Sequence, residues 1–220
     1  MPRAPLKVMI SSTAYGFEGT LRQMDAVLRQ FGYDVLNNEV GSIISRPGQS
    51  VPQACLEAVD NCDYFLGIIR GNYGTAQQEQ SGLTDAAISV THLEQRRATA
   101  LDKPRMFFAE RKVDFARLAL KPILKRIQPN HVDTNGHLVW DLPLAAGETN
   151  PFRGTPMISD LRVIAMLEEA QRGSGGAWTA RYNNWCQRFD REDEILRSLT
   201  ALFRDEGRLR ADLNDYNANP

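Results

Sequence analysis

The sequence predicts an α/β protein with a parallel sheet and helices on both of its faces. Short apolar runs typical of buried strands alternate with segments of helical periodicity between residues 7 and 109. A strand–helix repeat of this kind builds a parallel sheet. Ligands of such sheets bind beyond the carboxyl ends of the strands, where the strand order reverses. We therefore expect the functional residues to follow the first and third strands.

The first half of this sheet is predicted over residues 7–36. Residues 7–11 form a short apolar run that ends in small hydroxyl residues, as a buried strand opening into a loop does. Apolar side chains then recur at steps of four and three over residues 17–31, on one face of a helix, and Gly32 follows as a left-handed cap. Residues 33–36 are a second, weaker strand.

Two further strand–helix pairs follow. The helix after the polar loop begins at Ser50, because the hydroxyl, proline and glutamine of residues 50–53 are typical of a helix start. Residues 64–70 are the clearest strand of the chain. The next helix is expected from about residue 91 to residue 101, where Lys103-Pro104 ends it, and residues 105–109 are another apolar strand.

The remaining residues predict a mainly helical carboxy-terminal extension. Helical segments are expected over residues 114–128, 158–172 and 195–203, with a strand at 137–142 and a flexible connector at 173–176. Trp178, Tyr182, Trp185 and Phe189 also follow at helical spacing, which predicts a further helix. We expect an α/β domain over residues 1–130 and an extension over residues 131–220 that packs on the same core.

Composition excludes several classes of protein. With 42% hydrophobic and 24% charged residues, the chain has ordinary globular composition rather than that of a disordered protein. The 26 basic and 27 acidic side chains leave no surplus of positive charge for nucleic acid. No apolar run approaches the roughly 20 residues that cross a bilayer. The 3 cysteines are too few for a disulfide framework. We expect a cytoplasmic protein with no membrane or nucleic-acid partner.

Hydroxyl side chains follow the first strand. Ser11, Ser12 and Thr13, with Tyr15 behind them, lie just before the amino terminus of a helix. Hydroxyls and free backbone amides at such a position can hold a phosphate or a ribose. The alternative is that one hydroxyl only caps the helix. The segment lacks the Gly-Lys-Ser/Thr ending of a P-loop.

The third strand ends in Arg70-Gly71-Asn72-Tyr73-Gly74. Arg70 can pair with a phosphate, Gly71 lets the backbone approach a ligand, and Tyr73 offers a ring that can stack on a base. The alternative is a glycine-rich turn that serves the fold alone.

The third candidate is Thr91-His92-Leu93-Glu94, near the start of a helix. The Glu94 carboxylate could stabilise or attack a ribose carbon whose N-glycosidic bond breaks, with His92 nearby as a substrate-binding residue. The alternative is a capping box, in which Glu94 reaches back to the backbone N–H of Thr91. The histidines and cysteines have no metal-ligand spacing, so we expect no metal and no cofactor.

Together these segments resemble a bacterial family of TIR-like domains of unknown function, related to TIR domains and to nucleoside 2-deoxyribosyltransferases. The resembling pieces are residues 8–13 with Tyr15-Gly16, Glu39, residues 63–74, Thr91-x-x-Glu94 and Lys103-Pro104. The resemblance covers residues 6–110. The chain departs from the family at Gln95, where an aromatic residue often stands, and in the insert 75–90.

The resemblance implies a flavodoxin-like fold and makes Glu94 the counterpart of the glutamate that the enzymatic relatives use on an N-glycosidic bond. It implies a nucleotide N-glycosidase, with NAD as the first candidate substrate, in a setting of bacterial immunity against phage. Self-association, or association with another TIR-like protein, is the partner that it implies. Two alternatives stay open: a non-catalytic TIR-like module for nucleotide sensing or protein interaction, and a deoxyribosyltransferase that exchanges bases.

Overall fold

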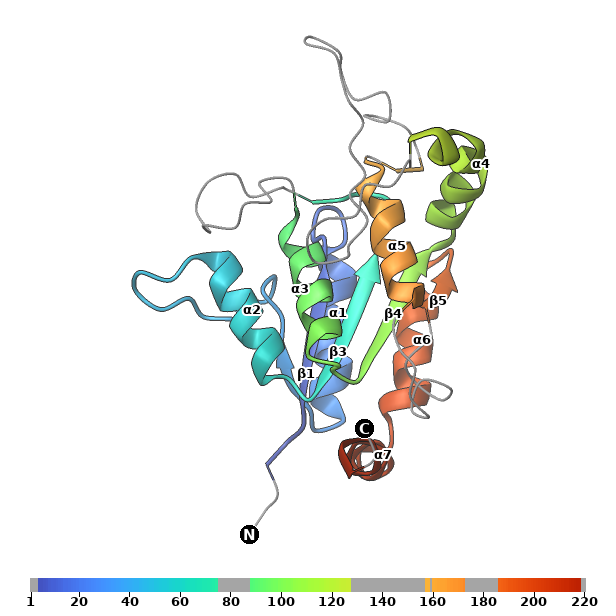
Figure 1. Ribbon diagram of the computed structural model, residues 1–220. Coiled ribbons are helices and arrows are strands. Elements are labelled where there is room, and N and C mark those ends of the chain that lie inside the picture. The colour runs from blue at the N-terminus through green and yellow to red at the C-terminus, as the bar shows by residue number, and fades with distance from the viewer. Residues whose placement is uncertain (1–3, 75–87, 128–156, 159, 173–185, 219–220) are drawn as a thin grey trace.

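Five parallel strands form one sheet in the computed structural model, which describes residues 4–74, 88–127, 157–158, 160–172 and 186–218 (Figure 1). The strands are β1 Lys7–Ser12, β2 Asp34–Leu36, β3 Tyr64–Ile69, β4 Arg105–Glu110 and β5 Cys186–Phe189. Their order in the sheet is β2-β1-β3-β4-β5, and every neighbouring pair is parallel. The predicted α/β class is confirmed, and the strand order reverses between β1 and β3.

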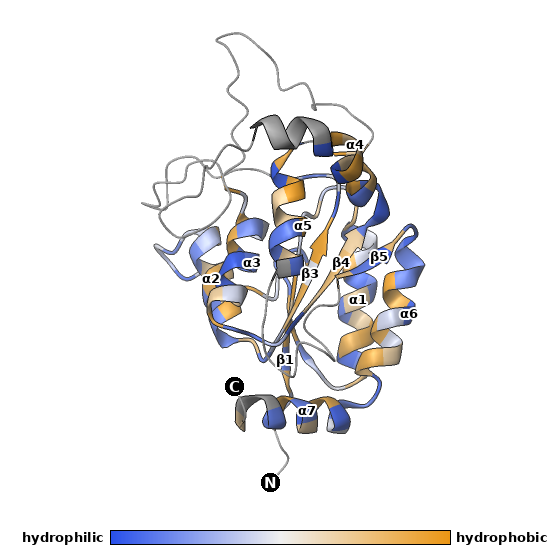
Figure 2. Ribbon diagram, turned by 45° about the vertical axis from the view of Figure 1, so that its right-hand side comes forward, coloured by the Kyte–Doolittle hydropathy of each residue, from blue (hydrophilic) through white to orange (hydrophobic). Residues whose placement is uncertain are grey.

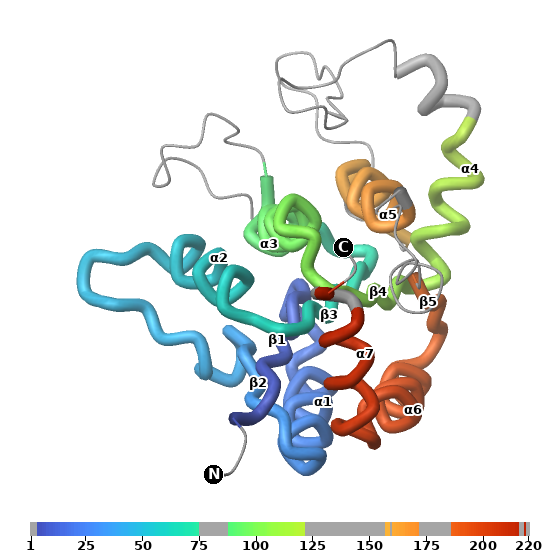
Figure 3. Tube along the Cα trace, turned by 60° about the horizontal axis from the view of Figure 1, so that its bottom comes forward, coloured from blue at the N-terminus to red at the C-terminus, as the bar shows by residue number. Residues whose placement is uncertain are grey.

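Helices cover both faces of the sheet (Figures 1 and 2). The helices on one face are α1 Glu18–Gln30 and α6 Glu192–Phe203, and those on the other face are α2 Val51–Asn61, α3 Val90–Ala100, α4 Arg111–Ile127 and α5 Arg162–Arg172. The helix α7 Glu206–Ala218 crosses below the sheet in Figures 1 and 2, and its core residues join the cluster of α1 and α6. Figure 3 shows the two groups on opposite sides of the strands. Because side chains alternate along a strand, Val8 and Ile10 pack with α1 while Met9 packs with α2 and α3. Both faces of the sheet are therefore buried.

Local signals set the helices as predicted. The apolar side chains at Phe17, Leu21, Met24 and Leu28 are all buried, and Gly32 follows α1 at a φ of +92°. At the start of α2, the Ser50 hydroxyl accepts from the Gln53 backbone N–H, and the Gln53 side chain accepts from the Ser50 backbone N–H. This is the capping box expected at Ser50.

The carboxy-terminal region differs from the prediction at Phe189. A helix was expected through this residue, but residues 186–189 form β5, which lies parallel to β4. Phe189 is buried in the core beside α6, whereas Gln187 and Arg188 are only half-buried. A four-residue edge strand with two polar residues gives no apolar run, so the aromatic spacing predicted the wrong element.

Several other expectations lie outside the described residues. They are the domain boundary at residue 130, the strand at 137–142, the connector at 173–176, most of the insert 75–90, and the helix through Trp178, Tyr182 and Trp185.

Candidate active site

A cavity of about 550 Å³ lies at the carboxyl ends of β1 and β3. Its walls come from residues 10–15 at the end of β1, residues 37–39 after β2, Asn72 and Gly74 after β3, and residues 89–91 with Glu94 at the start of α3. The helix α2 adds Val51 and Cys55. This is the point where the strand order reverses, so the expected location of the ligand site holds a cavity.

Glu94 reaches from α3 toward the end of β1. The Ser11 hydroxyl donates to Glu94 Oε2 at 2.5 Å, and the Cys55 thiol of α2 also hydrogen-bonds this carboxylate. Ser11 points toward α3 because it lies two residues after Met9, on the same face of the sheet. The carboxylate is thus held from two separate elements at the cavity wall.

The capping-box interpretation of Glu94 is wrong, because the cap of α3 lies earlier in the chain. Ser89 is the residue before the helix, and its hydroxyl accepts from the backbone N–H of His92 at 3.3 Å. With the helix end satisfied by Ser89, the Glu94 side chain is free to meet Ser11.

Burial controls the charge of Glu94, which is 5% exposed. Loss of hydration raises the pKa of this carboxyl to about 7 from an ordinary 4.5, against the hydrogen bonds from Ser11 and Cys55, which lower it. Near neutral pH the group therefore exchanges readily between its charged and neutral forms, as acid–base and nucleophilic groups in enzymes do.

The loop after β1 forms the next part of the wall. Ser12, Thr13 and Tyr15 all line the cavity, and the Tyr15 ring is 83% exposed at its edge. Thr13 donates from its hydroxyl to the Asn72 carbonyl at 3.2 Å, which ties this loop to the one after β3. The loops approach closely at Gly74, which has a φ of +84°; a Cβ there would lie 2.9 Å from Thr13 Cγ2.

Arg70 and Gly71 do not line the cavity. The Arg70 guanidinium donates to the Tyr15 carbonyl at 2.9 Å, stacks on the Phe17 ring at 4.5 Å and lies 3.6 Å from Glu110 Oε1. The backbone N–H of Gly71 donates to Glu110 Oε2 at 2.7 Å. In this arrangement Arg70 holds the loop that carries Tyr15, rather than facing the site where we expected it to bind phosphate.

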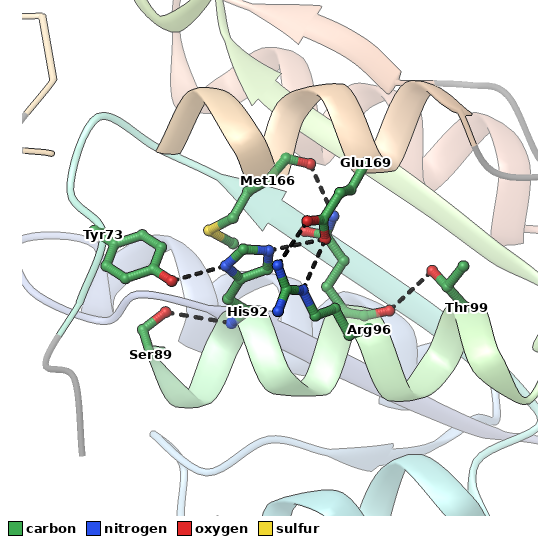
Figure 4. A network of polar contacts seen from close by, with 8 residues as sticks. Tyr73, Ser89, His92, Arg96, Thr99, Met166 and Glu169 are labelled. Carbon is green, nitrogen blue, oxygen red and sulfur yellow. Dashed lines mark hydrogen bonds and ion pairs between the residues drawn. The ribbon is translucent and has the colours of Figure 1, made fainter. Parts of the chain in front are cut away.

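Tyr73 and His92 also lie away from the cavity, in a buried polar network (Figure 4). The Tyr73 hydroxyl contacts His92 Nδ1 at 2.7 Å, and His92 Nε2 contacts Glu169 Oε2 at 2.9 Å. Arg96 donates to both Glu169 oxygens, at 2.8 and 3.1 Å. Because the Tyr73 side chain is only 2% exposed and Arg162 covers its ring, that ring is not placed to stack on a base.

Comparison with known proteins identifies the family. Residues 7–124 match the model of a family described as a domain of unknown function, DUF4062. The chain belongs to this family. No curated protein matches it. Among solved structures, the Clostridium botulinum CMP N-glycosidase BcmB is 18% identical, with a TM-score of 0.32 over 48% of this chain and 72% of that one.

Among the described residues, all those that line the cavity belong to the DUF4062 segment, whereas Glu169 lies beyond it. Sequence reasoning missed Asn37 and Asn38, although they follow β2, a neighbour of β1, and the rule on carboxyl ends applies to that strand as well. It also missed Cys55 and Glu169, because helical periodicity shows that a residue is buried but not which side chain it meets.

The structure describes residues 4–74, 88–127, 157–158, 160–172 and 186–218 of the chain. No helix there is long and apolar enough to cross a membrane. No three His, Cys, Asp or Glu side chains there come together as a metal site would require.

Proposed function

We propose that this DUF4062 protein breaks the N-glycosidic bond of a nucleotide, with NAD as the first candidate substrate. The observation that carries the proposal is the Glu94 carboxyl on the wall of a cavity of about 550 Å³, held by Ser11 and Cys55. Small-molecule sites commonly occupy roughly 300–1,000 Å³ and combine apolar walls with a few placed polar groups. This cavity has a volume in that range, and its wall is richer in hydroxyl and amide groups than such sites commonly are, which suits a polar ligand such as a nucleotide.

The proposed reaction needs an anion beside the ribose carbon. As the bond from C1′ to the nicotinamide nitrogen breaks, its electron pair moves to the nitrogen, and the positively charged ring leaves neutral. The sugar gains positive charge, which the Glu94 carboxylate stabilises or captures as a covalent ester. Water then adds to C1′ and releases a proton, so NAD and water give ADP-ribose, nicotinamide and H⁺.

The surrounding residues supply orientation and a partly dry setting. Ser11 fixes one oxygen of Glu94, while Ser12, Thr13 and Tyr15 offer hydroxyls and an exposed ring to the ribose, phosphate and base. A buried carboxylate stabilises developing positive charge more strongly than one in water does. No residue in this scheme requires a metal ion.

Chromatography of products tests the proposal. The purified protein is incubated with NAD, with CMP, and with a deoxynucleoside plus a free base. Nicotinamide or cytosine release that falls about 100-fold or more in Glu94→Gln supports the glycosidase. Glu57→Gln, on α2 but outside the cavity wall, is the matched control and retains full activity. Base exchange instead indicates a deoxyribosyltransferase, and product formation equal in both variants refutes the role of Glu94.

A non-catalytic nucleotide-sensing module is the second candidate. Exposed apolar side chains at the cavity edge, Tyr15 at 83% and Val51 at 48%, favour it, because such groups also serve in protein interfaces. Saturable nucleotide binding in calorimetry without products, together with a rise in solution mass on binding, is its expected signature. The proposed biological setting is bacterial immunity against phage. Its test is whether the protein protects bacteria against phage and whether Glu94→Gln loses that protection.

A further inference from the structure

The helix α5 lies beyond the DUF4062 segment and packs along α3, the helix that carries Glu94. Glu169 of α5 is the centre of the contact, since its carboxylate bonds both His92 and Arg96 of α3 (Figure 4). One turn earlier on α5, the Met166 carbonyl accepts from Gln95 Nε2 at 2.8 Å. Hydrogen bonds from three side chains of α3, those of His92, Gln95 and Arg96, thus join α3 to α5.

The carboxylate of Glu169 is the charged acceptor of the network. Arg96 and His92 lower the pKa of Glu169 to about 2 against the effect of burial, so its carboxylate is charged. Since a charged Glu169 accepts, His92 Nε2 carries a proton toward it, and the Tyr73 hydroxyl contacts Nδ1 of the same ring at 2.7 Å. Burial raises the pKa of Tyr73 to about 12, and its oxygen also receives the backbone N–H of Ser89. The chain of bonds runs from the cap of α3 to α5.

A hydroxyl, an imidazole and a carboxylate in line also describe a catalytic triad, but the burial excludes this role. The Tyr73 and His92 side chains are both about 2% exposed, and neither lines the cavity. No substrate in that cavity meets the hydroxyl. What the network contacts is α3, the helix that carries Glu94.

Opposite sides of α3 contact different parts of the protein. Residues two apart on a helix point in nearly opposite directions, about 200° around the axis. His92 consequently faces α5, while Glu94 faces Ser11 and Cys55. Tyr73 joins the first turn of α3 to the loop whose Asn72 and Gly74 line the cavity. The network therefore fixes two cavity walls relative to each other.

We propose that Glu169 is a positioning residue, which holds the first turns of α3 so that the Glu94 carboxylate meets Ser11 at the cavity wall. The proposal rests on the function given above. It means that a helix beyond the DUF4062 segment completes the geometry of a site whose described lining residues lie within that segment. A displacement of about 1 Å in such a group is enough to cost 100-fold in rate.

The test uses Glu169→Gln, which keeps the shape of the side chain and removes its charge, with Glu168→Gln on the same helix as the matched control. We expect the kcat for nicotinamide release to fall about tenfold or more in Glu169→Gln, with KM within about threefold, because the lost interaction acts on the reacting group. Glu168→Gln keeps the kcat of the natural protein. Tyr73→Phe is the milder second variant, and its kcat falls severalfold while the ring stays under Arg162.

A readout without catalysis separates this proposal from the proposed function. The apparent pKa of Glu94 is obtained from the pH dependence of stability, comparing each protein with its Glu94→Gln counterpart. Loosening of α3 admits water to the carboxyl, so we expect this pKa to fall by about one pH unit in Glu169→Gln and in Tyr73→Phe. An unchanged pKa in both variants overturns the positioning role, whether or not nicotinamide is released. A shifted pKa in a protein that releases no base upholds it and refutes the glycosidase alone.

Discussion

Replacement of Glu94 by glutamine should change how the stability of the protein depends on pH. Glutamine has nearly the same shape and still offers an oxygen to Ser11, but it never ionises. The pKa of Glu94 is about 7 in the folded protein against an ordinary 4.5, so the folded state binds this proton more tightly than the unfolded state does. The stabilisation is fully present below pH 4.5 and is lost as the pH rises through 7.

The magnitude follows from the same two values. Each pKa unit corresponds to about 1.4 kcal/mol, so the wild type should lose about 3 kcal/mol relative to Glu94→Gln between pH 4 and pH 8. Urea denaturation of both proteins across this range gives the difference in the free energy of unfolding. Glu57→Gln, whose side chain is 39% exposed, controls for the general effect of removing a carboxylate. A difference between wild type and Glu94→Gln that stays constant from pH 4 to pH 8 would refute the raised pKa of Glu94.

Three further outcomes are expected. Ser11→Ala removes a bond that lowers the pKa of Glu94, so the rise of kcat with pH should move to higher pH, measured as a pH–rate profile. Gly67→Ala should destabilise the fold by about 1–3 kcal/mol, since a Cβ on β3 would overlap the Phe107 ring; an unchanged thermal midpoint contradicts this packing. Ser50→Ala should cost about 1 kcal/mol in urea denaturation through loss of the capping box, whereas Ser50→Thr should recover most of it.

The sheet could be predicted because its signals are local. Strands buried on both faces are apolar runs, and helices such as α1 display one apolar stripe, so the periodicity alone predicts both. The strand β5 was not predicted, because it is short and half of its residues are polar. Its pairing with β4 is what makes it a strand. No particular helix was predicted over the residues of α7, because few apolar side chains mark it: Leu209 and Leu213 are the ones of its described side chains that join the core cluster.

The strand order predicts where the candidate site lies, but it does not predict which way the side chains there point. The rule on carboxyl ends predicted that Ser11 and its neighbours lie at the site, and the segment 91–94 together with the family resemblance predicted Glu94. The same rule placed Arg70 and Tyr73 nearby without showing which way they point. Arg70 turns to the Tyr15 carbonyl and the half-buried Glu110 carboxylate, and Tyr73 turns to the buried His92. A charged or hydroxyl group near the core needs a hydrogen-bonding or oppositely charged neighbour. Contacts of this kind join residues far apart in the chain, and no spacing predicts them.

The pairing of β4 with β5 has a practical consequence for work on this family. A protein cut at the end of the DUF4062 match, residue 124, would lack Cys186–Phe189 and leave the backbone N–H and C=O groups along one side of β4 bare. Uncovered strand edges recruit the edges of other molecules. Such a fragment should accumulate as insoluble material. Soluble preparations should require the chain through β5, which pairs with the edge of β4, and α6.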